Sequence, residues 1–124
     1  MRLSILLSCC ALLILQGCSS SAPVDGALAF QKCASCHAVG PNAHGAFGPQ
    51  LNGLFGRRAA STPDYAYSAA MKQSGITWND KTLAAFLRDP EKVVPGTKMR
   101  FWGIGDQREI DALLAHLRTF QDAR

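Results

Sequence analysis

One short motif in the chain combines two cysteines with a histidine. Residues 33–37 read Cys-Ala-Ser-Cys-His, the C-x-x-C-H pattern through which a c-type haem is attached. Cysteines three residues apart lie on the same side of a helical turn, where each sulfur can form a thioether with a haem vinyl group. The adjacent histidine can then supply an axial nitrogen ligand to the iron. The motif predicts one covalent haem c held by Cys33, Cys36 and His37.

A C-x-x-C pair has three other common uses, namely a disulfide, half of a zinc site and a redox-active thiol pair. A zinc site needs a second pair of ligands, and no cysteine follows Cys36. A thioredoxin-like thiol pair needs a βαβ surround, and no run of residues alternates in a way that predicts strands. Haem attachment is therefore favoured over these readings.

The N-terminus has the pattern of an export signal. Residues 3–15 form an apolar run that is too short to span a bilayer, which needs about 20 residues. The following Leu-Gln-Gly-Cys resembles a bacterial lipobox, in which the cysteine is acylated. We expect a signal peptide over 1–17, a lipidated Cys18 with a short tether over 18–25, and one domain over 26–124. The alternative is an ordinary signal cleaved near Ala22.

The charge balance is mildly basic. The chain has a formal charge of +4, which falls to +3 if the signal peptide and its Arg2 are removed. This excess favours docking with acidic partner proteins and is too small to indicate nucleic-acid binding. We expect a monomer on the periplasmic side of a bacterial membrane, attached to that membrane by its lipid.

The sequence predicts an all-α fold of about four to five short helices. The first covers 26–32, with Asp25 as its N-cap and with Leu28 and Phe30 in the core. Another ends near residue 73, and a third covers 81–88 and stops before Asp89-Pro90. Asp106 and Glu109 have the spacing of a capping box. The last helix, which they open, carries a regular apolar face formed by Ile110, Leu113, Leu114 and Leu117.

Two long irregular segments, 39–61 and 93–103, are expected to cover the haem. In the first, Leu51, Leu54 and Phe55 can pack on the ring, and a proline carbonyl can fix the tautomer of His37. The core of so small a chain is thin without the haem, so we expect the haem-free protein to be largely unfolded.

The second axial ligand decides what the haem can do. The candidates are Met71, Met99, His44 and His116. Met71 lies in a helical segment typical of core methionines, His44 is too near His37 in sequence, and His116 lies beside the leucines of the last helix. Met99, in a loop bounded by proline and glycine, is the preferred ligand. A thioether favours ferrous iron, and a filled sixth position favours electron transfer over catalysis or gas binding.

Residues 33–120 resemble a class I cytochrome c of the mitochondrial type. The resemblance is carried by the haem motif and by segments spread over nearly the whole domain, which are Gly48-Pro49, Leu54-Phe55-Gly56-Arg57, Tyr67, Gly75-Ile76-Thr77-Trp78, Thr82-Leu83, Pro95-Gly96-Thr97-Lys98-Met99, Leu113 and Leu117. It implies the small cytochrome c fold, with long loops wrapping one covalent haem.

The resemblance also implies a role for each matching residue. His37 and Met99 would ligate the iron, and the carbonyl of Pro49 would orient His37. Four further residues would lie near the buried haem propionates, which cannot be buried without donors: Arg57, Tyr67, Trp78 and Thr97. Tyr67 and Trp78 have the alternative role of ordinary core aromatics.

Three positions depart from the family pattern. Phe86 replaces a tyrosine whose hydroxyl bonds the methionine sulfur, and Met71 replaces an asparagine that helps to hold a buried water. Trp102 replaces a small residue near the expected haem edge, where it either adds to a docking surface or packs over its own loop.

The family docks its redox partners through a ring of lysines, which implies a similar role for the matching residues Lys32, Lys92, Lys98 and Arg100. Glu91 reverses the charge at one position, and residues 105–107 lack a basic cluster. The rate of docking should therefore depend on salt, although less strongly than it does in relatives with the full ring of lysines. The alternative is a solvated basic face with no partner role.

The sequence thus predicts a single-electron carrier rather than an enzyme. It would shuttle electrons between membrane redox complexes, from a donor such as a bc1-type complex to a terminal oxidase or photosynthetic reaction centre. The alternatives are a haem subunit of a dehydrogenase or peroxidase, a gas sensor with a displaceable Met99, and a thiol redox lipoprotein.

Overall fold

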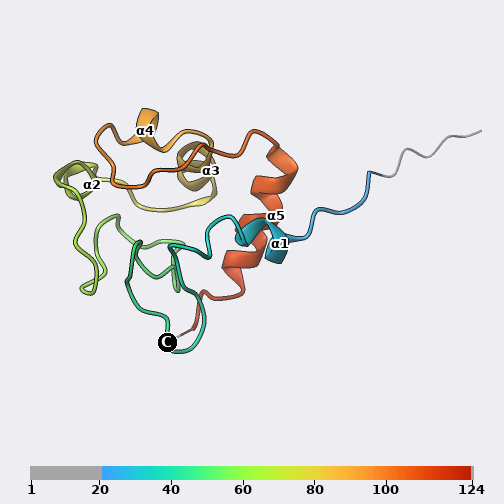
Figure 1. Cartoon of the computed structure of the whole chain (residues 1–124), viewed down its shortest axis with the longest axis horizontal. Helices are drawn as coiled ribbons and strands as arrows, with labels where there is room; N and C mark the ends of the chain where they lie inside the picture. The colour runs from blue at the N-terminus through green and yellow to red at the C-terminus, as the bar shows by residue number, and fades with distance from the viewer. Residues whose placement is uncertain (1–20, 124) are drawn as a thin grey trace, which may run out of the picture.

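A computed structural model describes residues 21–123, in which five helices are joined by long loops (Figure 1). The helices are α1 (Gly26–Phe30), α2 (Ala69–Gln73), α3 (Asp80–Arg88), α4 (Pro90–Val93) and α5 (Gln107–Arg118). Among these residues there is no strand, apart from an isolated antiparallel bridge between Arg58 and Thr77. The predicted all-α fold is confirmed. The expected signal peptide and Cys18 lie outside the described residues.

Side-chain caps fix where the helices begin. The Asp25 carboxylate accepts the backbone N–H of Ala27 at 2.8 Å, as predicted for the start of α1. Asn79 and Thr82 form a reciprocal capping box at the start of α3. None of the helices in the described part of the chain is long and apolar enough to cross a membrane.

The segment after α3 differs from the prediction. Asp89-Pro90 ends α3 as expected, but it also opens α4, which the sequence analysis missed. The Asp89 carboxylate accepts the N–H of Lys92 at 3.0 Å, and Pro90 occupies the first turn, where its missing N–H costs nothing. The same two residues therefore stop one helix and start the next.

The start of α5 also differs. Asp106 caps the helix by accepting the N–H of Arg108 at 2.9 Å. Glu109 does not reach back to Asp106, because its carboxylate forms an ion pair with Lys32. The expected capping box is therefore replaced by a tether between α5 and the residues that precede the haem motif.

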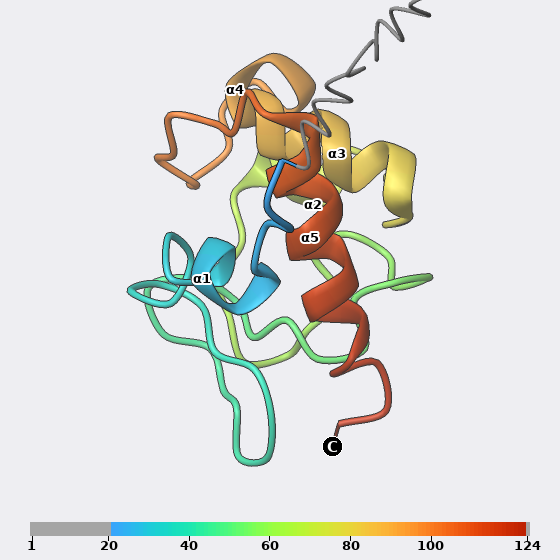
Figure 2. The ribbon, with the colours of Figure 1, turned by 90° about the vertical axis from the view of Figure 1, so that its right-hand side faces the viewer.

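The core forms around the apolar face of α5, which packs against both α1 and α3 (Figure 2). All four residues predicted for this face, Ile110, Leu113, Leu114 and Leu117, are buried. α1 comes so close to α5 that a Cβ on Gly26 would overlap with the carbonyl of Ala112. This approach buries Ala29 and part of Phe30, whereas Leu28, predicted to be core, points outward and is 61% exposed. The prediction for Leu28 was therefore wrong.

Candidate haem site

A cavity of about 310 Å³ lies between the long loops and the helical core. Its wall is mainly apolar and is contributed by loop residues and by helices α2, α3 and α5. Apart from Cys33 of the haem motif, the core side chains in this wall are Leu54, Met71, Trp78, Leu83, Phe86, Leu87, Leu113 and Leu117. Nine residues predicted to bind the cofactor all line this one cavity: Cys33, Cys36, His37, Pro49, Arg57, Tyr67, Trp78, Thr97 and Met99.

The haem motif occupies a series of turns that continues from α1. The N–H groups of Cys36 and His37 both donate to the carbonyl of Cys33, at 3.0 and 2.9 Å. Cys33 is buried and Cys36 is exposed, and both thiols are free rather than joined in a disulfide. Burial raises the pKa of the Cys33 thiol to about 11, so this thiol stays protonated at neutral pH. The turn thus presents two thiols and an imidazole to one cavity.

The imidazole of His37 is held in one tautomer. Its Nδ1–H donates to the carbonyl of Pro49 at 2.7 Å, and burial lowers the pKa of His37. A neutral ring that donates through Nδ1 leaves Nε2 unprotonated and able to bind a metal. The chemistry of this donor set therefore fits haem iron.

Gly48 packs against the face of this ring. A Cβ at residue 48 would lie 2.6 Å from Cε1 and 2.8 Å from Nδ1 of His37. We expect Gly48→Ala to push the ring away from Pro49 and to lower the free energy of unfolding by about 1–3 kcal/mol, the usual cost of overpacking. Thermal unfolding of the haem-containing protein, followed by circular dichroism, measures this loss.

Gly105→Ala is the matched control for that experiment. Gly105 is exposed, and nothing lies within 4 Å of the position of its Cβ, so the change should be within about 0.5 kcal/mol of wild type. Equal stability of the two alanine variants would contradict the role given to Gly48.

Arg57 is a partly buried cation beside the cavity. Its guanidinium donates to the carbonyls of Asn52 at 2.7 Å and Gln50 at 2.9 Å, and among the described residues it forms no ion pair with a carboxylate. Burial lowers the pKa of Arg57. A carboxylate of a bound group could pair with this cation, so Arg57 also fits a haem propionate.

The other three residues predicted to lie near the propionates also line the cavity, but their surroundings differ from those of Arg57. Thr97 and Trp78 are buried in the cavity wall. The hydroxyl of Tyr67 lies 2.6 Å from that of the buried Thr62, a partner that the sequence analysis did not identify. No periodicity or motif marks Thr62, because this contact lies within the irregular stretch that precedes α2.

Two of the four candidate axial ligands line the cavity, and two do not. Met99 and Met71 both line it, Met71 being buried as expected for a core methionine. His44 is exposed, and its Nδ1 lies 3.1 Å from the carbonyl oxygen of Asn42. The ring of His116 is partly buried and packs against the rings of Phe30 and Phe120. Met99 follows the buried Thr97, whose hydroxyl accepts the Met99 N–H at 3.2 Å.

Several other predictions for the loops have clear outcomes. Leu51 and Leu54 line the cavity as expected. Phe55 does not line it; the guanidinium carbon of Arg118 lies 4.0 Å from the centroid of the Phe55 ring. Tyr65 and Phe47 line the cavity and were not predicted, since neither belongs to a recognisable pattern. The side chain of Trp102 is fully exposed, so it does not pack over its own loop.

Comparison with known proteins agrees with this geometry. The family model for cytochrome c matches residues 23–121. The chain is 46% identical to cytochrome c-550 of Bradyrhizobium diazoefficiens, over 77% of this chain and 70% of that one, and 48% identical to cytochrome c2 of Rhodoplanes tepidamans, over 77% and 89%. Among solved structures, cytochrome cH from Methylobacterium extorquens aligns with a TM-score of 0.70 and 42% identity, over 76% of this chain and 94% of that one.

The chain therefore belongs to the cytochrome c family. Membership implies a covalently bound haem c and the general role of an electron carrier. The cavity, the two thiols, the oriented imidazole and the partly buried Arg57, which pairs with no carboxylate among the described residues, are the features that fit such a group.

Proposed function

We propose that this protein is a single-electron carrier in which His37 and Met99 fill both axial positions of one haem c. The observation that carries the proposal is that an imidazole with a fixed tautomer and a thioether line the same, mainly apolar cavity. With both positions filled by side chains, no site on the iron is left for a substrate. The bound group would then supply one-electron redox chemistry, and the chain would set its potential and its access to water.

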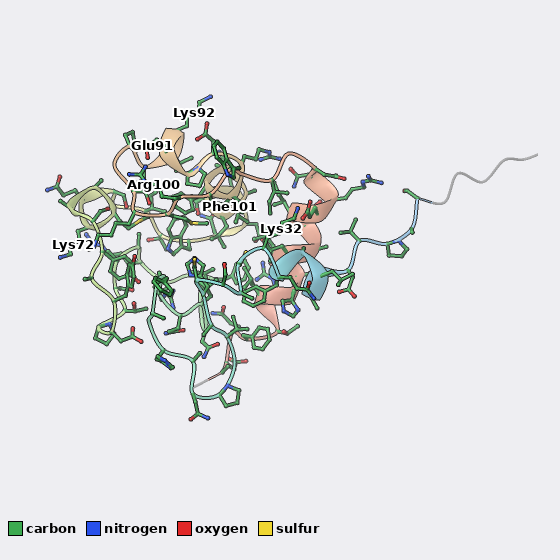
Figure 3. The ribbon with its side chains drawn as sticks, viewed as in Figure 1. Lys32, Lys72, Glu91, Lys92, Arg100 and Phe101 are labelled. Atoms are coloured by element: carbon green, nitrogen blue, oxygen red, sulfur yellow. The ribbon has the colours of Figure 1, made fainter. Side chains whose placement is uncertain are left out.

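The proposed partners are membrane redox complexes. A bc1-type complex as donor, with a terminal oxidase or a photosynthetic reaction centre as acceptor, suits a small monomeric carrier. Of the basic residues expected to dock them, Lys32 follows α1, Lys92 belongs to α4, and Lys98 and Arg100 lie in the loop after α4; Lys32, Lys92 and Arg100 are labelled in Figure 3. Their charge is partly neutralised, since Lys32 pairs with Glu109 and Arg100 lies 3.8 Å from Glu91. This supports docking that depends only moderately on salt.

The proposal includes export and attachment by a lipid on Cys18. It rests on the lipobox-like sequence at residues 15–18 and on the apolar run before it. After removal of residues 1–17, the domain would stay near the membrane on a tether of about eight residues, which spans at most about 28 Å. The intact mass of protein extracted from membranes tests this, and an unmodified Cys18 would contradict it.

Trp102 offers a second, apolar component to the docking surface. It directly follows Phe101, which lines the cavity, and its own side chain is fully exposed. Aromatic side chains that become buried at an interface often dominate its binding energy. A partner that covers the side of the cavity near Phe101 would also cover this tryptophan.

The test is the rate at which membranes containing the acceptor oxidise the ferrous protein, measured at increasing ionic strength. The wild-type rate constant should fall as salt rises. Trp102→Ala should reduce it by roughly fivefold at every salt concentration, since loss of an interface anchor costs about 1 kcal/mol or more.

Leu28→Ala removes another exposed apolar side chain, on α1, and should react like wild type. Wild-type rates that do not change with ionic strength would contradict the role of charge in docking. Equal rates for Trp102→Ala and Leu28→Ala would contradict the role of Trp102.

A further inference from the structure

Glu91 contacts both ends of the short segment that carries Met99. The N–H of Gly96 donates to its Oε1 at 2.9 Å, and Nη1 of Arg100 lies 3.8 Å from its Oε2. Glu91 belongs to the first turn of α4, and Arg100 lies near it in space (Figure 3). One carboxylate thus bridges residues 96 and 100, with Met99 between them.

Thr97 and Lys98 attach the rest of the segment to its surroundings: the N–H of Thr97 donates to the carbonyl of Val94 at 2.9 Å, and Nζ of Lys98 donates to the carbonyl of Ala66. Thr97 is buried, and its hydroxyl accepts the N–H of Met99. Gly96 has a φ of +87°, so the chain turns sharply at this glycine as it enters the segment. Lys98 and Arg100 are exposed, and Met99 is only partly buried. The buried Thr97 therefore holds the segment from the inside, and Glu91 and Lys98 hold it from the outside.

We infer that Glu91 is a positioning residue that keeps the Met99 segment closed against the haem site and so restrains the exchange of Met99 for external ligands. This inference rests on the proposed ligation by His37 and Met99. The hydrogen bond to Gly96 contributes most of the restraint, because an exposed ion pair at 3.8 Å is weak and is screened by solvent.

The test is a titration of the ferric protein with imidazole, which displaces an axial thioether and changes the visible spectrum. Glu91→Ala leaves the N–H of Gly96 without its acceptor and should raise the apparent affinity for imidazole about fivefold, as expected for the loss of one hydrogen bond. The matched control is Asp80→Ala. It removes another exposed carboxylate, which pairs with Arg118 at 2.6 Å and joins α3 to α5.

An increase for Glu91→Ala of more than about twofold over that for Asp80→Ala supports the inference. A smaller difference between the two variants overturns it. Glu91→Gln keeps a side-chain oxygen that can accept the Gly96 N–H, so its imidazole affinity should stay within about twofold of wild type. An affinity equal to that of Glu91→Ala would overturn the assignment of the restraint to this hydrogen bond.

A second readout separates this inference from the proposed function. The exchange rate of the Gly96 amide proton in the ferrous protein, measured by NMR, reports the hydrogen bond itself and should rise in Glu91→Ala. An unchanged rate overturns the inference even where Met99 ligates the iron. A wild-type ferric spectrum without the absorption band of a thioether ligand would instead contradict the proposed ligation, and the Gly96 exchange rate would still decide whether Glu91 holds the segment.

Discussion

The Cys33→Ala/Cys36→Ala variant is expected to lose its haem and to be largely unfolded. Eight buried apolar side chains, from Leu54 to Leu117 and including Met71, line the cavity, so without haem they would lose packing partners. Burial of each such side chain is worth about 1.5–3 kcal/mol. Loss of part of this contribution at all eight side chains approaches the entire stability of a small domain, which is about 5–15 kcal/mol.

The far-UV circular dichroism melt of the purified variant measures this effect. Ala34→Ser is the control, because it changes an exposed residue of the same motif and keeps both cysteines and His37. It should retain covalent haem and melt cooperatively, close to wild type. A cooperative, native-like melt of the haem-free double variant would contradict the view that haem completes the core.

Met99→Ala is expected to open the iron to external ligands. Without the thioether, carbon monoxide should bind the ferrous protein and shift its visible spectrum at a concentration that leaves wild type unchanged. The reduction potential should also fall, because a thioether favours ferrous iron. A spectrum of the reduced variant with and without carbon monoxide, together with a redox titration, measures both effects.

Met71→Ala is the matched control, since Met71 is the other methionine that lines the cavity. This variant should lose about 2–5 kcal/mol of stability, as buried large-to-small substitutions do, and should still exclude carbon monoxide. Binding of carbon monoxide by Met71→Ala but not by Met99→Ala would reverse the assignment of the axial ligand.

The haem motif and the apolar face of α5 could be predicted because each is a local pattern. Cys33, Cys36 and His37 are adjacent in sequence, and the leucines of α5 repeat at helical spacing. The start of α1 follows from the chemistry of a single residue, Asp25. Patterns of this kind specify which residues share a turn or a helix face before any tertiary contact is known.

Three of the errors, at Leu28, Glu109 and Phe55, arose where a distant segment decides the outcome. In α1, which helix face is buried depends on how closely Gly26 approaches α5, and this approach leaves Leu28 outside. Glu109 has the spacing for a cap but meets Lys32 from another part of the chain. Phe55 packs under Arg118, which comes from the distant helix α5. Local rules contain no information about such partners.

The central claim is that protein side chains fill both axial positions of the haem. The most direct test is the visible spectrum of the dithionite-reduced wild-type protein before and after addition of carbon monoxide at neutral pH. Sharp low-spin bands that carbon monoxide does not change are the predicted result. A clear shift on adding carbon monoxide would show that the Met99 side opens readily, and it would contradict the assignment as a simple electron carrier.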